Sequence, residues 1–228
     1  MNDNIIAIDG PAGSGKSSVA REIAQKTDFY YMDSGAYYRA VTLYFLRLFK
    51  SENLSEDFSN WVSSNDLKPY LKNIILDSKL NKEEENKTFL NGEDVSGEIR
   101  LPEVTDAIKY LAVIYEVREH VNKALYHLSK NCKLVMDGRD IGTEVFPDAK
   151  LKFYLTANSE VRARRRWEEY KQKGIEINIK TLQEDIVKRD DSDMNRKIAP
   201  LKQAEDAILI DTSSLSKNIV INMILSRL

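Results

Sequence analysis

The chain has 228 residues, of which 42% are hydrophobic and 31% are charged, the balance of an ordinary globular domain. Its formal net charge of -2 argues against a basic surface for nucleic acid, and no apolar run approaches the roughly 18 residues of a membrane-spanning helix. The single cysteine, Cys132, allows no disulfide within the chain, which is typical of the cytoplasm. We expect a cytoplasmic monomer that binds neither membranes nor nucleic acid.

Short apolar runs and helical patterns alternate along the chain, which is typical of a parallel sheet with helices on its faces. Five runs are expected to form strands, at 5–8, 29–32, 134–136, 151–155 and 207–210. Apolar residues at helical spacing follow the first strand, and further helices are expected at about 36–50, 116–130, 159–173, 178–191 and from 216 to the end. The sequence therefore predicts an α/β fold.

The segment from about 66 to 100 departs from this alternation. It contains short apolar runs at 74–76 and 88–90, a polar stretch between them and an Asn91-Gly92 turn signal. This pattern is typical of small antiparallel strands joined by polar turns. We expect an inserted subdomain here, with the acidic run at 83–85 in a solvated turn.

A glycine-rich stretch after the first predicted strand fits the P-loop pattern G-x-x-x-x-G-K-[ST]. Glycines let the backbone turn tightly and aim N–H groups at anionic oxygens, and the helix that follows adds its positive dipole end. Lys16 can reach the β- and γ-phosphates and the Ser17 hydroxyl can hold Mg²⁺; a turn without a ligand is the alternative. The residues expected to bind ATP are Gly10, Pro11, Ala12, Gly13, Ser14, Gly15, Lys16, Ser17 and Ser18.

Two further strand ends carry polar clusters, at the edge where open α/β sheets bind their ligands. The segment 33–39, DSGAYYR, follows the second predicted strand, and Asp33 or Ser34 can cap the next helix. The segment 137–140, DGRD, follows the third, and Asp137 occupies the position of a Walker-B carboxylate that orients Mg²⁺. The alternatives are a capped helix with a surface arginine and a glycine-containing surface turn.

An arginine cluster lies on the helix predicted at 159–173. It comprises Arg162 and the run 164–166. Phosphoryl transfer concentrates negative charge on the equatorial oxygens, and arginines are a common counterweight. The alternative is a basic helix face that pairs with the glutamates of the same helix.

A second group of charges lies at the end of the helix predicted at 178–191. Arg189, Asp193 and Arg196 are spaced i, i+4 and i+7, so they project from one face if the helix continues. Such a face can bind a sugar hydroxyl pair and phosphates together. Otherwise it is a string of surface salt bridges worth about 1 kcal/mol or less.

Together these motifs resemble the bacterial cytidylate kinases, which belong to the nucleoside monophosphate kinases. The matching blocks are IDGPAGSGKSS, MDSGAYYRA, GEDVSGEIR, MDGRDIGTEVFPDA and KRDDSDMNRKIAPL, between residue 5 and about 201. The resemblance implies a five-stranded parallel P-loop core with helices on both faces, an antiparallel NMP-binding subdomain and a short lid. The boundaries that we predict are a core at about 1–60 and 101–228, an insert at about 63–100 and a lid at about 158–175.

The resemblance also implies the reaction ATP + CMP (or dCMP) ⇌ ADP + CDP (or dCDP), with Mg²⁺ held by Ser17 and, through water, by Asp137. It implies Arg39 on the CMP phosphate, Arg118 and Asp140 on the cytosine edge, Arg189 and Asp193 on the ribose, and Arg196 near the base. The CMP-binding residues implied are Ser34, Tyr38, Arg39, Arg118, Asp140, Arg189, Asp193 and Arg196. The implied catalytic residues are Lys16, Arg139, Arg162, Arg165 and Arg189.

One departure from the family pattern and three other functions stay open. Lys109 aligns with a serine that helps to read cytosine in some relatives, and a long cation there would alter base recognition. A GTPase switch needs an N-K-x-D element, which the sequence lacks. A kinase for another small metabolite would share the P-loop, although the acceptor motifs favour a nucleotide. A non-catalytic nucleotide-binding module is disfavoured by Lys16 and the arginines.

Overall fold

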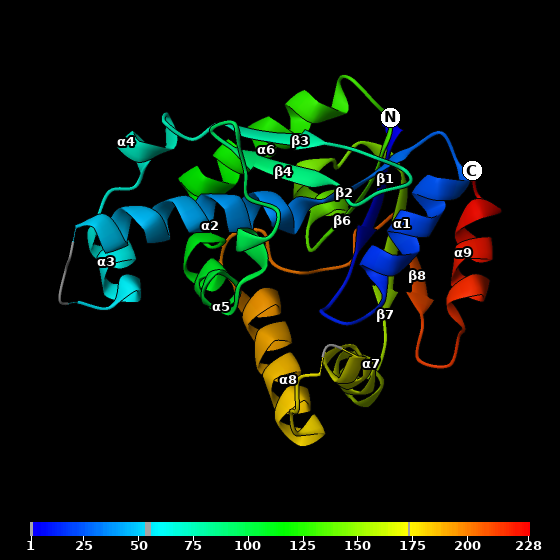
Figure 1. The fold of residues 1–228 in the computed structure, drawn as a ribbon. Coiled ribbons are helices and arrows are strands. Elements are labelled where there is room, and N and C mark those ends of the chain that lie inside the picture. The colour runs from blue at the N-terminus through cyan, green and yellow to red at the C-terminus, as the bar shows by residue number, and fades with distance from the viewer. Residues whose placement is uncertain (1, 53–55, 173) are drawn as a thin grey trace. The chain divides into compact units, whose positions relative to one another are not determined.

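The computed structural model describes residues 2–52, 56–172 and 174–228. Residues 53–55 of the predicted core and residue 173 of the predicted lid and helix lie outside the described residues, as does residue 1. The chain divides into two compact units, one comprising Met1–Tyr30 with Lys133–Leu228 and the other Tyr31–Cys132. Figure 1 follows the chain from blue to red, and the boundary between the units falls within strand β2.

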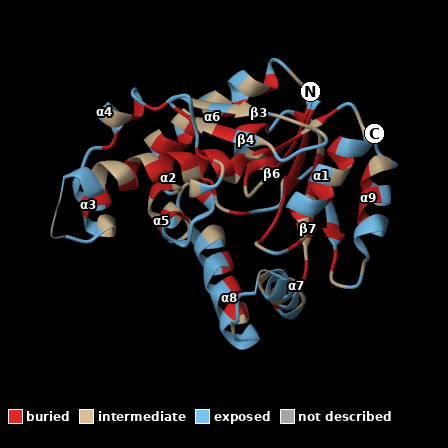
Figure 2. Ribbon diagram, in the orientation of Figure 1, coloured by how far each residue is buried: buried red, intermediate tan, exposed pale blue. Residues whose placement is uncertain are grey.

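A parallel sheet contains the strands of the first unit together with β2, the strand within which the boundary falls. In the described residues the sheet has five strands in the order β2-β6-β1-β7-β8, and β1 is parallel to both β6 and β7. The central strand β1 is buried over residues 5–9, as the red ribbon in Figure 2 shows, because parallel strands are covered on both faces. The strands are β1 (Asn2–Asp9), β2 (Tyr30–Asp33), β6 (Leu134–Gly138), β7 (Ala149–Thr156) and β8 (Ile208–Asp211).

Helices of the first unit join these strands and pack beside them. Helix α1 packs on β6 and against α9, whereas α7 and α8 pack on each other through Ala163, Leu182 and Ile186. A short π-helix, η2, follows β6 after Arg139 and Asp140. The bounds are α1 (Lys16–Lys26), η2 (Ile141–Val145), α7 (Ser159–Gln172), α8 (Ile179–Asn195) and α9 (Lys217–Leu225).

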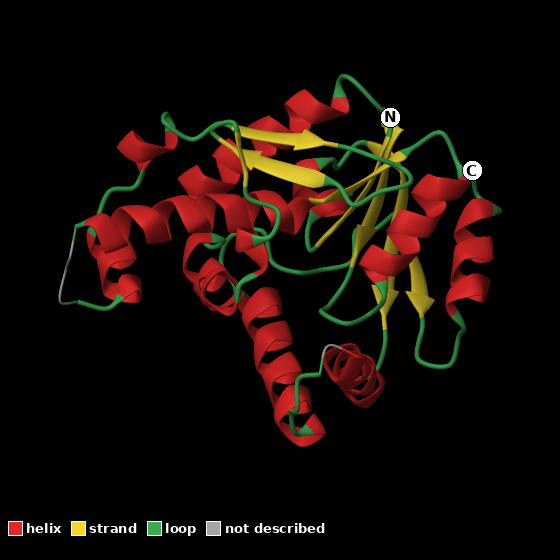
Figure 3. Cartoon of the chain, in the orientation of Figure 1, coloured by secondary structure: helices red, strands yellow, loops and turns green. Residues whose placement is uncertain are grey.

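The second unit combines helices with a small antiparallel sheet, β3-β4-β5 (Figure 3). Asn91 and Gly92 form the two-residue turn between β4 and β5, with φ of 52° and 84°, the left-handed geometry of a hairpin turn. The elements are α2 (Ser34–Ser51), α3 (Phe58–Ser64), α4 (Lys68–Leu71), β3 (Leu76–Lys79), β4 (Lys87–Leu90), β5 (Glu93–Asp94), the 3₁₀ turn η1 (Glu98–Arg100), α5 (Pro102–Leu111) and α6 (Tyr115–Ser129).

The predicted α/β class, with a five-stranded parallel sheet and an added antiparallel sheet, is confirmed. Each predicted strand and helix overlaps an observed one, whereas α3, α4, α5, β5, η1 and η2 lie outside the predicted elements. The first two are short, and η2 has no sequence signal because its backbone is fixed by a distant side chain. Among the described residues, no helix combines the length and the apolar character that crossing a membrane requires.

Candidate functional site

The P-loop adopts a conformation that only glycine permits at several positions. Gly10, Gly13 and Gly15 have φ of 144°, 76° and 92°, in the region that side chains disfavour. At Gly10 a Cβ atom would also lie 1.9 Å from the Leu155 carbonyl oxygen, so the loop enters against β7 without room for a side chain. Helix α1 then begins at Lys16, directly after Gly15, as the motif predicts.

Lys16 is buried inside this loop. Its Nζ donates to the Pro11 carbonyl oxygen at 2.7 Å and to Ser14 Oγ at 3.4 Å. Burial and the positive charge of Arg139 lower the pKa of Lys16, and the carboxylates of Asp137 and Asp9 oppose that effect. A buried cation with a lowered pKa gains most from an anionic ligand, which a triphosphate supplies.

Two arginines of α7 and a threonine donate hydrogen bonds to backbone carbonyl oxygens of the P-loop. Arg162 Nη1 donates to the Ala12 carbonyl oxygen at 3.1 Å, and Arg165 Nη1 donates to that of Ser14 at 3.4 Å. The Thr212 hydroxyl also donates to the Ser14 carbonyl oxygen, at 3.1 Å, and Thr212 accepts from Arg165 at 3.0 Å. These contacts fix the peptide planes whose N–H groups a phosphate would contact.

Arg162 is the more deeply buried of the two arginines. Its Nη1 lies 2.6 Å from Asp190 Oδ2 on α8, and the two side chains are 7% and 10% exposed. Its Nε donates to the Ala157 carbonyl oxygen at 2.8 Å. The other oxygen of Asp190, Oδ1, is buried and accepts no hydrogen bond from the residues that the structure describes. Arg162 thus ties α8 to the P-loop.

Ser17 and Asp137 lie together at the end of β6, as predicted. The Ser17 hydroxyl donates to Asp137 Oδ2 at 2.8 Å across 120 residues of sequence. A hydroxyl beside a carboxylate is a pair of hard oxygen ligands, which suits Mg²⁺ held mainly by phosphates and water. No group of three or more acidic, histidine or cysteine side chains within the described ranges could form a metal site by itself.

Four predicted residues of the first unit form one chain of ion pairs. Arg139 Nε donates to Asp193 Oδ2 at 2.8 Å, and Asp193 Oδ1 lies 3.9 Å from Arg196. Arg196 in turn lies 3.5 Å from Asp140 Oδ1, with both side chains less than 8% exposed. Burial alone would lower the pKa of Arg139, but Asp193 raises it above its ordinary value. The arginines are therefore charged and held in place.

Arg189, Asp193 and Arg196 do not lie on one helical face, because the helix does not continue as far as Arg196. Helix α8 ends at Asn195, and Arg196 has extended backbone angles of -64° and 141°. Arg196 Nε instead donates to the Ala199 carbonyl oxygen at 2.6 Å, beyond the helix end. Arg189 lies near enough to Lys16 to lower the pKa of that lysine. Arg189 therefore interacts with the P-loop lysine, whereas Arg196 lies beyond the helix and bonds to the segment that follows it.

In the second unit, Asp33 pairs with two arginines at the start of α2. Arg39 Nη2 lies 3.2 Å from Asp33 Oδ2, and Arg100 Nη2 lies 2.9 Å from the same oxygen. Burial alone would raise the pKa of Asp33, but the two guanidinium groups lower it below its ordinary value. Asp33 occupies the predicted N-cap position, and its carboxylate also holds two cations at one point. Arg100, the last residue of the block GEDVSGEIR, was not among the predicted site residues.

The remaining predicted residues of the second unit lie on α2 and α6. Ser34 and Tyr38 are buried on α2, and Arg118 is buried on α6. The guanidinium carbon of Arg118 lies 5.3 Å from the Tyr38 ring centroid, and its Nη1 donates to the Ala112 carbonyl oxygen at 3.1 Å. Lys109 is exposed on α5, with its Nζ 5.0 Å from the ring centroid of Tyr110.

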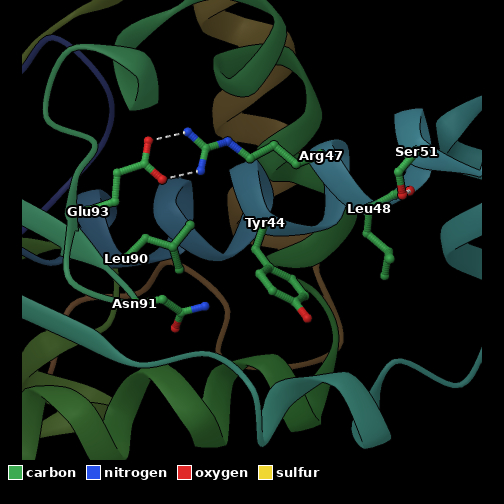
Figure 4. A pocket seen from close by; sticks show the side chains of 7 residues that line it. All are labelled: Tyr44, Arg47, Leu48, Ser51, Leu90, Asn91 and Glu93. Atoms are coloured by element: carbon green, nitrogen blue, oxygen red, sulfur yellow. Dashed lines mark hydrogen bonds and ion pairs between the residues drawn. The ribbon is translucent and has the colours of Figure 1, made fainter.

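A shallow pocket of about 320 Å³ lies elsewhere in the second unit, beside α2 (Figure 4). Arg47 lines it and donates to Glu93 at 2.7 and 2.8 Å, the two bonds dashed in Figure 4. None of the predicted site residues lines this pocket. Because Arg47 already pairs with a glutamate that lines the same pocket, its charge is neutralised and the pocket does not resemble a phosphate site.

Comparisons with known proteins agree with the motifs. The model of the family described as "Cytidylate kinase" matches residues 6–228. A cytidylate kinase of Caldanaerobacter subterraneus is 45% identical and covers 96% of this chain and 92% of its own length. A cytidylate kinase of Bacillus licheniformis is 42% identical and covers 96% and 93%. The crystal structure of TT1252 from Thermus thermophilus covers 100% of this chain and 99% of its own, at 17% identity and a TM-score of 0.46, which is too low to add to the assignment. Because the family model and these relatives span nearly the whole sequence, this chain belongs to the cytidylate kinase family.

Proposed function

We propose that this chain transfers the γ-phosphoryl group of ATP to CMP or dCMP, giving ADP and CDP or dCDP. The observation that carries the proposal is the proximity of buried Lys16 to Arg139 and Arg189 in a chain of the cytidylate kinase family. Three cations near a P-loop can neutralise the negative charge of the transferring phosphoryl group, of the donor phosphate that it leaves and of the acceptor phosphate that it joins. Family membership makes the chain an enzyme, a nucleoside monophosphate kinase.

The chemistry requires position and charge rather than a covalent nucleophile. A phosphate oxygen of the acceptor attacks the γ-phosphorus in line, and ADP leaves with the electron pair of the broken P–O bond. Lys16 neutralises the β- and γ-phosphates, while Arg139 and Arg189 neutralise the equatorial oxygens. Arg162 and Arg165 stay proposed as further cations; because each donates to a P-loop carbonyl, contact with a phosphoryl oxygen requires an exchange of partners.

We propose that Arg39 and Arg100 bind the phosphate of the acceptor. Ser34 and Tyr38 lie on α2, the helix that also carries Arg39. Asp193 and Arg189 bind the ribose.

The cytosine edge is assigned to three residues. Asp140 accepts from the exocyclic amine of cytosine, and Arg118 and Arg196 donate to its carbonyl and ring nitrogen. A carboxylate that accepts from an exocyclic amine distinguishes cytosine from uracil, because uracil carries an oxygen there.

Mg²⁺ fits the oxygen pair of Ser17 and Asp137, with Asp137 acting through water. When bound, the ion would neutralise negative charge on the phosphates of ATP. Ser17 supplies the hydroxyl ligand and Asp137 holds that hydroxyl by the hydrogen bond already described. We also propose that the protein acts in the cytoplasm as a monomer and that its ligands are nucleotides, not nucleic acid or membranes. Light scattering during size-exclusion chromatography would measure its mass in solution.

A coupled ADP-release assay with CMP, dCMP, UMP and AMP tests the function. We expect CMP or dCMP to give the highest kcat/KM, with UMP and AMP at least about tenfold lower because each loses a paired polar group. Faster turnover of AMP or of a non-nucleotide acceptor would show that the acceptor is assigned wrongly.

A further inference from the structure

Asp9 is a buried carboxylate with no part in the reaction proposed above. It is the last residue of β1 and is 5% exposed. In the sheet it lies opposite Gly138 of β6 and Tyr154 of β7. The next residue, Gly10, begins the P-loop, so Asp9 stands at the junction between the sheet and the phosphate-binding loop.

The Asp9 carboxylate accepts two backbone hydrogen bonds from the segment after β6. Oδ1 accepts from the Ile141 N–H at 2.8 Å and Oδ2 accepts from the Gly142 N–H at 2.7 Å. These are the first two N–H groups of η2, which a helix leaves without partners in its own backbone. The side chain therefore caps this π-helix from another strand, 132 residues away in the sequence.

Two residues with proposed roles lie next to this cap. Asp140 is the N-cap residue of η2, and Arg139 precedes it. Gly142 leaves space for the arrangement, since a Cβ there would lie 3.1 Å from Lys152 Cδ and 3.4 Å from Asp9 Oδ2. The backbone at Gly142 therefore lies between the Asp9 carboxylate and the methylene groups of the Lys152 side chain.

We propose that Asp9 is a positioning residue, which caps η2 and so places Arg139 and Asp140 at a fixed distance from the P-loop that begins at Gly10. This inference rests on the proposed function, because Asp140 is given the base and Arg139 the phosphoryl group. A carboxylate that accepts hydrogen bonds from two successive N–H groups fixes both the orientation and the position of the backbone that carries them. Misplacement of a binding group by about 1 Å can cost on the order of 100-fold in rate.

The surroundings of Asp9 make its charge sensitive to pH near neutrality. Burial raises the pKa of Asp9 to about 7, and the two N–H donors limit the rise. The other charged or titratable groups that face it are Asp140 from the turn, Lys16 from α1, and Tyr154 and Lys152 from β7. The negative charge of Asp140 favours the protonated form of Asp9, whereas Lys16 favours the carboxylate.

The test uses Asp9→Asn, since asparagine has the hydrogen-bonding groups of a protonated carboxyl and cannot accept both N–H bonds in the same way. We expect kcat/KM for CMP to fall by on the order of 100-fold, with the Kd for ATP within about threefold of wild type. Asp3→Asn is the matched control, because Asp3 is an exposed carboxylate on the same strand. It should leave both constants unchanged.

A pH series separates positioning from a general loss of structure. The ratio of wild-type to Asp9→Asn affinity for CMP, measured by calorimetry without ATP, should shrink about tenfold from pH 8 to pH 6, as a group with a pKa near 7 becomes protonated. Ionisation of the CMP phosphate cancels in this ratio. A ratio independent of pH, together with kcat/KM for CMP within threefold of wild type, would overturn the proposal.

Gly142→Ala supports the test if Asp9→Asn does not fold. It keeps the carboxylate and displaces the turn by crowding Lys152, so kcat/KM for CMP should fall while ATP binding persists. Unchanged use of CMP by a folded Gly142→Ala protein would contradict the inference. If wild type proves to prefer another acceptor, the proposed function fails; the same comparison with that acceptor still decides the role of Asp9.

Discussion

The ion pairs beside the P-loop and those of Arg47 on α2 use the same residue types in opposite surroundings. Arg162 and Asp190 are 7% and 10% exposed, whereas Arg47 and Glu93 are 37% and 57% exposed. An exposed pair forms with little desolvation and contributes little to stability. A buried pair carries a large desolvation cost, so its presence next to a phosphate-binding loop indicates a requirement beyond stability.

The largest effect is expected for Arg162→Met, which leaves Asp190 buried without its cation. We expect a loss of about 3–5 kcal/mol in the free energy of unfolding, measured by urea denaturation. Arg166→Met is the matched control, because Arg166 pairs with Glu169 on the same helix with side chains 45% and 60% exposed. Equal losses in the two variants would remove the distinction between buried and exposed pairs.

Lys16→Ala should act on catalysis rather than on folding. Removing this cation should lower kcat by about 10²–10³-fold, as loss of one charge-stabilising donor does in other enzymes. Stability should rise or stay level, because the variant removes a buried charge whose pKa is lowered by burial. Unchanged turnover in the ADP-release assay would contradict the role given to this lysine.

Asp193→Ala is expected to weaken CMP binding by about 10–100-fold, since it removes the proposed ribose acceptor and frees Arg139 and Arg196 from their shared carboxylate. ATP affinity should change by less than about threefold. Calorimetric titrations with each nucleotide measure both constants. A parallel loss of the two affinities would instead indicate that the variant is misfolded.

The pH dependence of stability should carry the signature of Asp9. Its pKa of about 7 in the folded chain lies above the ordinary value of 3.8, so between those values the folded state holds a proton that the unfolded state has released. Stability therefore falls as pH rises from about 4 to 7, by at most about 1.4 kcal/mol per pH unit from this group. Subtracting the profile of Asp9→Asn isolates the contribution; no difference in slope would contradict the raised pKa.

The smallest effect is expected for Arg47→Ala on α2. Its pairs with Glu93 and Glu98 are partly exposed, so the free energy of unfolding should change by about 1 kcal/mol or less and kcat should not change. Denaturation at low and high salt measures the screened part. A loss as large as that of Arg162→Met would show that burial does not separate the two regions.

The local motifs were predictable because their parts are adjacent in the sequence. The P-loop glycines, the start of α1 at Lys16 and the Asn91-Gly92 hairpin each depend on backbone preferences of a few neighbouring residues. Local spacing did not determine the end of α8. A face through Arg196 was expected only if the helix predicted at 178–191 continued that far, and the helix ends at Asn195. Periodicity describes a face only while the helix lasts, and nothing in the spacing marked that end.

The sequence by itself determined the fold class, the family and the position of the phosphate-binding loop, because strand, loop and helix signals are short-range. Only the tertiary structure decided which charges meet. Asp33 with Arg100, Arg162 with Asp190 and the cap from Asp9 join residues far apart in the chain. Such pairs form because folding removes both groups from water, so that each needs a hydrogen-bond or charge partner nearby. The fold decides which residue supplies that partner, and the spacing of residues in the sequence does not show it.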